Sequence, residues 1–333
     1  MSIRAISTPN IAFIKYWGNR NDELRLPAAD SLSMTLEQPV VEVVVDHAEL
    51  FSAHSFETDG TERIVTDKES IRLEKHFLLT KRYFVDIGEV EAFPASVSLE
   101  IRSGIPKSVG LASSAAVFSA LAEAYGVFVK DLSRRDVSVL ARLGSGSASR
   151  SVFGGFVAMV AGNGEGIDSS YAQQIAPESH WKLSDIILVP SNDEKVIGST
   201  EGHALAYTSP LFKKRIQDVC QRQKDCIDAI MRKDFEKLQY VAEEDCLDMH
   251  AVMESSTPRL QYVSAETRRI VQEVKDLRSR EGIGVLYTMD AGSTVHLICE
   301  EGAIESVRAF ARAQTHCTVY EAGIGGGSHI LES

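Results

Sequence analysis

The stretch Pro106-Lys107-Ser108-Val109-Gly110-Leu111-Ala112-Ser113-Ser114-Ala115-Ala116 decides what kind of fold this chain adopts. Its polar and small residues run directly into alanines at helical spacing, so we predict a loop that ends where a helix begins. The first turn of a helix leaves backbone N–H groups unpaired, and such groups bind anions. Serine is also a common helix cap, so the stretch is either a triphosphate cradle or an ordinary capped helix.

The composition is that of an ordinary soluble protein long enough for two lobes. The chain has 333 residues, of which 44% are hydrophobic and 25% charged, and its formal charge of −12 argues against nucleic acid or an anionic membrane as a partner. No uninterrupted apolar run of membrane-spanning length occurs, so we expect neither secretion nor a membrane span, and a cytoplasmic protein. The cysteines form no C-x-x-C pair and are expected to be reduced thiols, not zinc ligands: Cys220, Cys226, Cys246, Cys299 and Cys317.

The pattern of apolar residues predicts an α+β fold in two lobes, residues 1–185 and residues 186–333. In the second lobe, helices are expected at about 209–233, 235–254 and 264–281, followed by strands and one more helix. The first lobe is expected to begin with strands Ile3–Thr8 and Ile11–Trp17 and a strand from residue 40. The segment 160–185 is polar and is predicted to lead up to the boundary between the lobes.

Two features near the N-terminus attract attention. Lys15 follows an apolar stretch, where a lysine either reaches outward to solvent or needs a buried partner. The small polar segment from Leu26 to Ser33 is read as a turn, which either presents Asp30, Ser31 and Ser33 to a ligand or is only a turn.

Gly144-Ser145-Gly146-Ser147-Ala148-Ser149-Arg150-Ser151 is a second candidate anion site. Four serines and two glycines surround a single arginine, whose planar guanidinium suits a carboxylate or a phosphate. A flexible linker is the alternative, which we consider weaker because the segment leads without a break into an apolar strand.

Asp290 lies in the turn Thr288-Met289-Asp290-Ala291-Gly292-Ser293 between two apolar runs. Such a turn is common in hairpins for structural reasons, but it could also deliver a catalytic carboxylate into a cleft between the lobes. The glycine-rich tail from Gly323 to Ser328 is either a third backbone-lined loop or a frayed end. The histidines show no metal-ligand spacing.

Taken together, these segments resemble the GHMP kinase superfamily, and within it the decarboxylases that act on phosphorylated mevalonate. The matching segments occur in the family's order over nearly the whole chain: 10–18, 26–36, 110–116, 144–155, 195–210, 249–251 and 290–292. The resemblance implies a lobe like domain 2 of ribosomal protein S5, then a ferredoxin-like lobe, with the active site in the cleft between them. It also implies ATP and Mg²⁺ as cofactors, a small-molecule substrate and a homodimer.

The implied reaction phosphorylates the 3-hydroxyl of a 5-phosphorylated mevalonate with ATP and then releases phosphate and CO₂. By resemblance, Asp290 would orient or deprotonate that hydroxyl, Lys15 would pair with Asp290, and Arg150 would clamp the substrate carboxylate. The residues expected to bind the nucleotide are Lys107, Ser108, Gly110, Leu111, Ala112, Ser113 and Ser114, with Ser114 also near the metal. Those expected to bind substrate are Tyr16, Trp17, Asn19, Ser145, Gly146, Ser147, Arg150, Lys195 and His250.

Asn19 departs from the family pattern, which commonly continues Trp-Gly with a lysine that helps to hold the 5-diphosphate. A site with one cation fewer compensates less negative charge, so it favours a ligand that carries fewer phosphate groups. We therefore favour mevalonate 5-phosphate as the substrate, with the 5-diphosphate as the alternative, unless Arg20 replaces the missing lysine. A kinase that stops at the 3-phosphate and a silent nucleotide or isoprenoid-phosphate sensor are the remaining alternatives.

Overall fold

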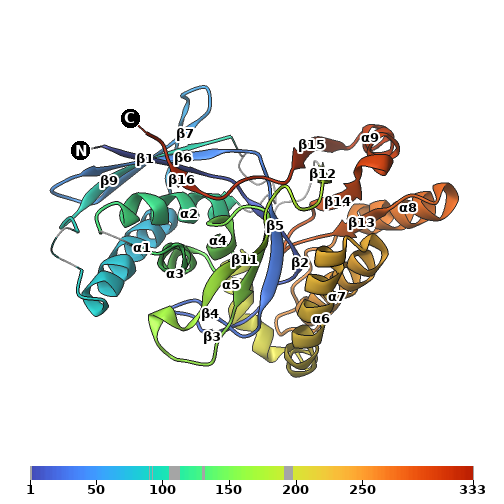
Figure 1. The fold of residues 1–333 in the computed structure, drawn as a ribbon, viewed down its shortest axis with the longest axis horizontal. Helices are drawn as coiled ribbons and strands as arrows, with labels where there is room; N and C mark the ends of the chain where they lie inside the picture. Colours follow the sequence, from blue (N-terminus) through green and yellow to red (C-terminus); the bar gives the residue numbers. More distant parts are fainter. Residues whose placement is uncertain are drawn as a thin grey trace.

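The computed structural model describes residues 2–89, 91, 93–104, 113–129, 132–190 and 198–332. The chain forms an α+β fold of two lobes, which confirms the predicted fold class (Figure 1). Within these residues, none of the helices is long and apolar enough to cross a membrane.

The first lobe is built on a sheet with the order β16-β1-β6-β9-β7-β8. Its central strands alternate between buried and exposed residues, because helices cover only one face of the sheet. The helix that follows the opening stretch, α2, packs directly on β1 and β6. The strands of this sheet are β1 (Ile3–Ser7), β6 (Val41–His47), β7 (Ser52–Glu57), β8 (Glu62–Arg63), β9 (Val97–Ser103) and β16 (His329–Ile330). The helices on it are α1 (Asp67–Asp86) and α2 (Ser113–Gly126), and α3 (Arg134–Gly144) packs against both helices and against β11 (Tyr171–Ala176).

A second sheet, with the order β11-β10-β5-β2, lies between the first lobe and the helices of the second. All residues of β2 and β5 are buried, because β2 also packs against the second-lobe helices α6 and α7. This sheet therefore connects the first lobe with the helices of the second lobe. Its strands are β2 (Asn10–Ile14), β5 (Ser31–Thr35), β10 (Phe156–Val160) and β11 (Tyr171–Ala176), with the hairpin β3 (Asn19–Asn21) and β4 (Leu26–Pro27) and the short helix α4 (Ala148–Ser151) nearby.

The second lobe is an antiparallel sheet with the order β13-β14-β12-β15, covered by helices. The chain runs strand, helices, two strands, helix, strand, which is the ferredoxin-like arrangement implied by the resemblance. The strands are β12 (Leu183–Pro190), β13 (Val285–Thr288), β14 (Val295–Glu300) and β15 (Cys317–Gly323), and the helices are α5 (Ser199–Leu205), α6 (Phe212–Arg232), α7 (Phe235–Ser255), α8 (Ala265–Glu281) and α9 (Ile304–Ala313).

The glycine-rich tail is not a frayed end. Gly325 donates from its backbone N–H to the carbonyl of Thr35 at 2.9 Å, and Ser328 donates to the carbonyl of Ser151 at 3.0 Å. A side chain at Gly327 would come within 2.2 Å of the Val152 carbonyl, so glycine is needed for this close approach. The tail then adds β16 to the edge of the first sheet, beside the N-terminal strand (Figure 1).

The polar segment 160–185 contains β11, whose outward residues are polar because it lies at the edge of its sheet. One prediction about local structure was wrong. Ser31 and Ser33 do not form a turn but belong to the buried strand β5, and Asp30 accepts a hydrogen bond from the backbone of Ala161 at 2.7 Å.

Candidate active site

Lys15, which is buried, and Asp290, which is partly exposed, form an ion pair where the two lobes meet. The Lys15 Nζ lies 2.7 Å from Asp290 Oδ1, and the exposed fraction of the side chain is 1% for the lysine and 35% for the aspartate. Lys15 therefore does not reach outward to solvent. Burial raises the pKa of Asp290, but the charge and hydrogen bond of Lys15, together with the charges of His296 and Arg150, lower it below its ordinary value, so the carboxyl is ionised at neutral pH.

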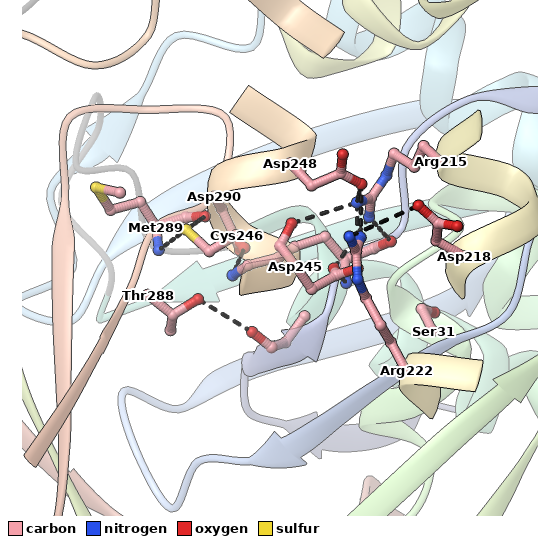
Figure 2. Close-up of polar contacts among 12 residues, drawn as sticks. Ser31, Arg215, Asp218, Arg222, Asp245, Cys246, Asp248, Thr288, Met289 and Asp290 are labelled. Atoms are coloured by element: carbon pink, nitrogen blue, oxygen red, sulfur yellow. Dashed lines mark hydrogen bonds and ion pairs between the residues drawn. The ribbon is translucent and has the colours of Figure 1, made fainter. Parts of the chain in front are cut away.

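The backbone of Lys15 is held by a buried carboxylate from the second lobe. The Lys15 N–H donates to Asp245 Oδ2 at 2.7 Å, while Arg215 Nη2 donates to the Lys15 carbonyl at 3.1 Å. Arg215 also donates to both oxygens of Asp245, at 3.1 and 3.0 Å (Figure 2). Helices α6 and α7 thus clamp both polar backbone groups of one residue after β2.

The chain next to Asp290 is held by Cys246, the residue that follows Asp245 on α7. The Met289 N–H donates to Cys246 Sγ at 3.2 Å, and the thiol lies 3.5 Å from the Met289 carbonyl (Figure 2). Adjacent residues of α7, Asp245 and Cys246, therefore fix the chain at Lys15 and the chain next to Asp290. This arrangement sets the distance between the two charged side chains.

A second layer of charge surrounds this clamp. Arg222 Nη1 donates to Asp248 Oδ2 at 2.6 Å and to Asp245 Oδ1 at 3.4 Å, and Arg215 also reaches Asp248 at 2.8 Å (Figure 2). Two guanidinium groups from α6 thus face two carboxylates from α7. The buried Asp245 carboxylate is fully compensated, as a buried charge must be.

Arg150 is a buried cation held only by neutral groups. It is 3% exposed, and it donates to Ser33 Oγ at 2.9 Å, Ser31 Oγ at 2.6 Å and Asn10 Oδ1 at 3.1 Å. Among the residues that the structure describes, it forms no ion pair with a carboxylate. Burial lowers its pKa to about 10, and Asp290 opposes that shift, so the guanidinium is protonated at neutral pH and can accept an anionic ligand.

Serine hydroxyls from two segments meet beside this group. Ser114 Oγ, in the first turn of α2, lies 3.1 Å from Ser145 Oγ, which lies 3.5 Å from Ser147 Oγ. The opening stretch and the second anion segment are thus neighbours in space. Five of the residues predicted to bind the nucleotide lie outside the described residues: Lys107, Ser108, Gly110, Leu111 and Ala112. Lys195 and the side chain of Ser113 also lie outside them.

Tyr16 and Asn19 lie next to the same segment. A side chain at Gly146 would come within 2.4 Å of the Tyr16 ring, so the absence of one there lets the ring pack against the backbone. The Tyr16 hydroxyl donates to Asn19 Oδ1, and Asn19 Nδ2 donates to Asp22 Oδ1 at 2.9 Å. Burial raises the pKa of Tyr16 to about 12, so the phenol remains protonated and able to donate.

Trp17 packs in an apolar cluster. Its indole is 3% exposed, with its ring centroid 4.6 Å from that of His203. Its predicted substrate contact stays a prediction. The Gly18 N–H donates to His203 Nδ1 at 2.9 Å, which requires that nitrogen to be unprotonated, and burial accordingly lowers the pKa of His203 to about 3.

His250 lies beside the ion pair, on α7. It is 5% exposed and its Nε2 has no hydrogen-bond partner among the described residues. Burial, followed by the Lys15 charge, lowers its pKa to about 4, so the ring is neutral at physiological pH. A neutral imidazole with a free nitrogen can line a substrate pocket without adding charge.

The clamp residues were missed by the sequence analysis, although a signal was present. Arg215 and Asp245 both occupy positions in the buried stripes of their helices, where apolar residues are expected. A charge in such a stripe indicates a buried partner elsewhere. His203 has no comparable signal.

This chain is similar to known proteins over most of its length. Residues 7–172 match the model for the diphosphomevalonate decarboxylase-like N-terminal domain, and residues 185–322 match the mevalonate 5-diphosphate decarboxylase C-terminal domain. The diphosphomevalonate decarboxylase of Debaryomyces hansenii is 34% identical over 89% of this chain and 79% of its own length. That of Rattus norvegicus is 34% identical over 92% of this chain and 78% of its own length.

Solved structures give the same result. A chain described as MDDEF in complex with MVAPP, AMPPCP and magnesium is 29% identical and superposes with a TM-score of 0.88, covering 100% of this chain and 99% of that one. Mevalonate diphosphate decarboxylase from Staphylococcus aureus is 30% identical with a TM-score of 0.87, covering 99% and 98%.

Replacing Lys15 with methionine should raise the pKa of Asp290. The charge and hydrogen bond of the ammonium are the main effects that oppose burial, so their removal leaves burial as the dominant effect, and we expect a higher pKa. Titration of the carboxyl by ¹³C NMR measures this, and the spectrum of Asp290→Asn identifies the resonance. An unchanged pKa would show that Lys15 does not control the charge of Asp290.

Asp245→Asn should lower turnover more than Asp248→Asn does. Both substitutions remove a carboxylate that faces Arg215 and Arg222, but only Asp245 also holds the Lys15 backbone. Misplacing a positioned group costs about tenfold or more in rate, so we expect that loss in kcat for Asp245→Asn only. Thermal melts check that both variants fold, and equal kcat values would contradict a positioning role.

Proposed function

Since the chain belongs to the diphosphomevalonate decarboxylase family, we propose that it converts mevalonate 5-diphosphate to isopentenyl diphosphate, with consumption of ATP and release of phosphate and CO₂. The chain is an ATP-dependent carboxy-lyase. The observation that carries the proposal is the ion pair between the buried Lys15 and the partly exposed Asp290, with the Arg150 cation, which has no carboxylate partner among the described residues, near it.

This substrate differs from the one favoured by the sequence analysis. The interpretation of Asn19 favoured the 5-phosphate, whereas the relatives compared above carry the name of the 5-diphosphate. The 5-phosphate remains the second candidate, because position 19 does lack a cation: Asn19 bonds only with Tyr16 and Asp22 among the described residues.

Asp290 acts on the 3-hydroxyl as an orienting acceptor. Its lowered pKa makes it a weak base, so it cannot strip a proton from an alcohol in advance. Instead it accepts a hydrogen bond from the hydroxyl and takes the proton as the new oxygen–phosphorus bond forms. Lys15 keeps the Asp290 carboxylate ionised and holds it in position to accept from the 3-hydroxyl.

Arg150 holds the substrate carboxylate in line with the leaving phosphate. After phosphorylation, the C3–O bond breaks and phosphate leaves with the bonding electrons. The C1–C2 bond breaks in turn, its electron pair forms the C2–C3 double bond, and CO₂ departs. A fixed guanidinium keeps these two bonds aligned, which lowers the entropic part of the barrier.

The described residues fit ATP and Mg²⁺. The hydroxyl of Ser114 is an oxygen ligand of the kind that Mg²⁺ prefers, and Ser145 and Ser147 offer donors for phosphate oxygens. The described part of the chain holds no group of three or more acidic, histidine or cysteine ligands, so the phosphates themselves would complete the coordination. When bound, Mg²⁺ neutralises charge on the transferred phosphoryl group.

Asp290→Asn should reduce turnover by at least about a hundredfold, as removal of a proton acceptor does. The amide keeps the shape but cannot take the hydroxyl proton, and it also leaves Lys15 without its buried counter-ion. ATP consumption dependent on the mevalonate substrate measures this. Activity near that of the wild type would show that another group accepts the proton.

A comparison of kcat/KM for mevalonate 5-diphosphate and mevalonate 5-phosphate tests the substrate. We expect a clear preference for the diphosphate, with one CO₂ released for each ATP consumed. A preference for the monophosphate would overturn the proposed substrate while leaving the reaction unchanged. Formation of the 3-phosphate without CO₂ would instead identify a kinase.

A further inference from the structure

His203 is a buried histidine of the second lobe that has no role in the chemistry described above. It lies on α5 and is 7% exposed, and its ring packs against two aromatic rings of the first lobe. Its ring centroid is 4.3 Å from that of Tyr16 and 4.6 Å from that of Trp17. Its Nδ1 accepts a hydrogen bond from the backbone N–H of Gly18 at 2.9 Å. One side chain thus contacts the three consecutive residues that follow Lys15.

The turn at Gly18 depends on this acceptor. Gly18 has a φ of 89°, in the left-handed region, and a side chain there would come within 2.4 Å of the Phe212 ring. Its carbonyl accepts from the backbone N–H of Ala28 at 3.0 Å, and its N–H donates to His203. Both polar backbone groups of this buried residue are therefore paired, and removal of the imidazole would leave the N–H unpaired.

The imidazole can accept this bond because it is neutral. A ring nitrogen that accepts a hydrogen bond carries no proton, so the proton of the neutral ring is on Nε2. Burial lowers the pKa of His203 to about 3, so the ring keeps this form at neutral pH. A protonated ring would instead direct a second N–H at the N–H of Gly18.

The contacts of His203 extend to the substrate side of the site through Tyr16. The Tyr16 ring packs on the backbone of Gly146, where a side chain would come within 2.4 Å of the ring. Its hydroxyl donates to Asn19 Oδ1. Because Gly146 belongs to the segment that also carries Arg150, a displaced imidazole would shift Tyr16 and Asn19 relative to that cation.

We propose that His203 is a positioning residue, which sets the affinity for the mevalonate substrate by fixing Tyr16 and the turn at Gly18 without touching the substrate. The inference rests on the proposed function, since it concerns the same substrate. Tyr16 and Asn19 are predicted substrate contacts on the two sides of this turn. Contacts that are already in place need no ordering when the substrate binds, whereas a loosened turn must be ordered at a cost in affinity.

His203→Phe tests the acceptor, because it keeps an aromatic ring beside Tyr16 but leaves the Gly18 N–H unpaired. We expect KM for mevalonate 5-diphosphate to rise by at least about tenfold, on the scale of one lost buried hydrogen bond. The KM for ATP should stay within about twofold, because the nucleotide is expected at the 107–114 segment. Hydrogen exchange of the Gly18 amide should become faster, which reports the lost bond independently of activity.

Two further substitutions separate the acceptor from the size of the side chain. His203→Asn should retain most of the affinity and the slow exchange, because its Oδ1 takes the place of Nδ1 and can accept the same bond. His203→Gln places its acceptor one bond further from the backbone and should behave like His203→Phe. It repeats the test where His203→Phe does not fold.

His180→Phe is the matched control. His180 also bonds to a backbone group and packs edge-on against an aromatic ring, but these partners are the Ile230 carbonyl, at 2.9 Å from Nε2, and Phe156. Thermal melts are expected to show a loss of stability in both phenylalanine variants, with a raised KM only in His203→Phe. An equal rise of KM in His180→Phe would show that KM follows stability, and would overturn the positioning role.

The results distinguish this inference from the proposed function. If the wild type decarboxylates only mevalonate 5-phosphate, the proposed substrate is wrong, but a raised KM for that substrate in His203→Phe and its recovery in His203→Asn still support the inference. An unchanged KM in folded His203→Phe, an equal rise of KM for ATP, or a His203→Asn variant no better than His203→Phe overturns the inference whichever substrate is used. Failure of the wild type to turn over either substrate would overturn both.

Discussion

The site depends on one buried interaction, the contact between the Asp245 carboxylate and the backbone of Lys15. A buried carboxylate must be fully compensated, and Arg215 together with the Lys15 N–H provides that compensation. The residue after β2 is therefore bound to helix α7, because its backbone N–H is one of the groups that compensate the Asp245 charge. Because Cys246 is the next residue of that helix and holds Met289, the same attachment brings Lys15 to Asp290, 275 residues away in the chain.

Around this attachment, the site is locally cationic in a chain of formal charge −12. Arg150 is buried against neutral oxygens, and Arg72 donates to the Gly144 carbonyl next to Ser145. These groups are costly to hold together without anions. A substrate that carries a carboxylate at one end and phosphate at the other, together with ATP, supplies the missing negative charge. The repulsion stored in the free protein thus favours binding of anionic substrates.

The helices of the second lobe were predicted well because each has a continuous apolar stripe, and the sequence predicted α6, α7 and α8 to within a few residues. The strand β5 was read as a turn because its serines are small and polar, and only Arg150 accounts for their burial. The monophosphate was favoured from Asn19 alone. That inference counted the cations near one position in the sequence, whereas Arg72 reaches the residue before Ser145 from helix α1.

The sequence by itself determined the α+β class, the resemblance to a family and the identity of Lys15, Arg150 and Asp290 as candidates, because periodicity and local motifs are properties of neighbouring residues. Only the tertiary structure decided that Lys15 is buried against Asp290, that Ser31 and Ser33 hold Arg150, and that Asp245 positions the pair. Each of these is a contact between residues far apart in the chain, and such a contact exists only after the sheets and helices have packed.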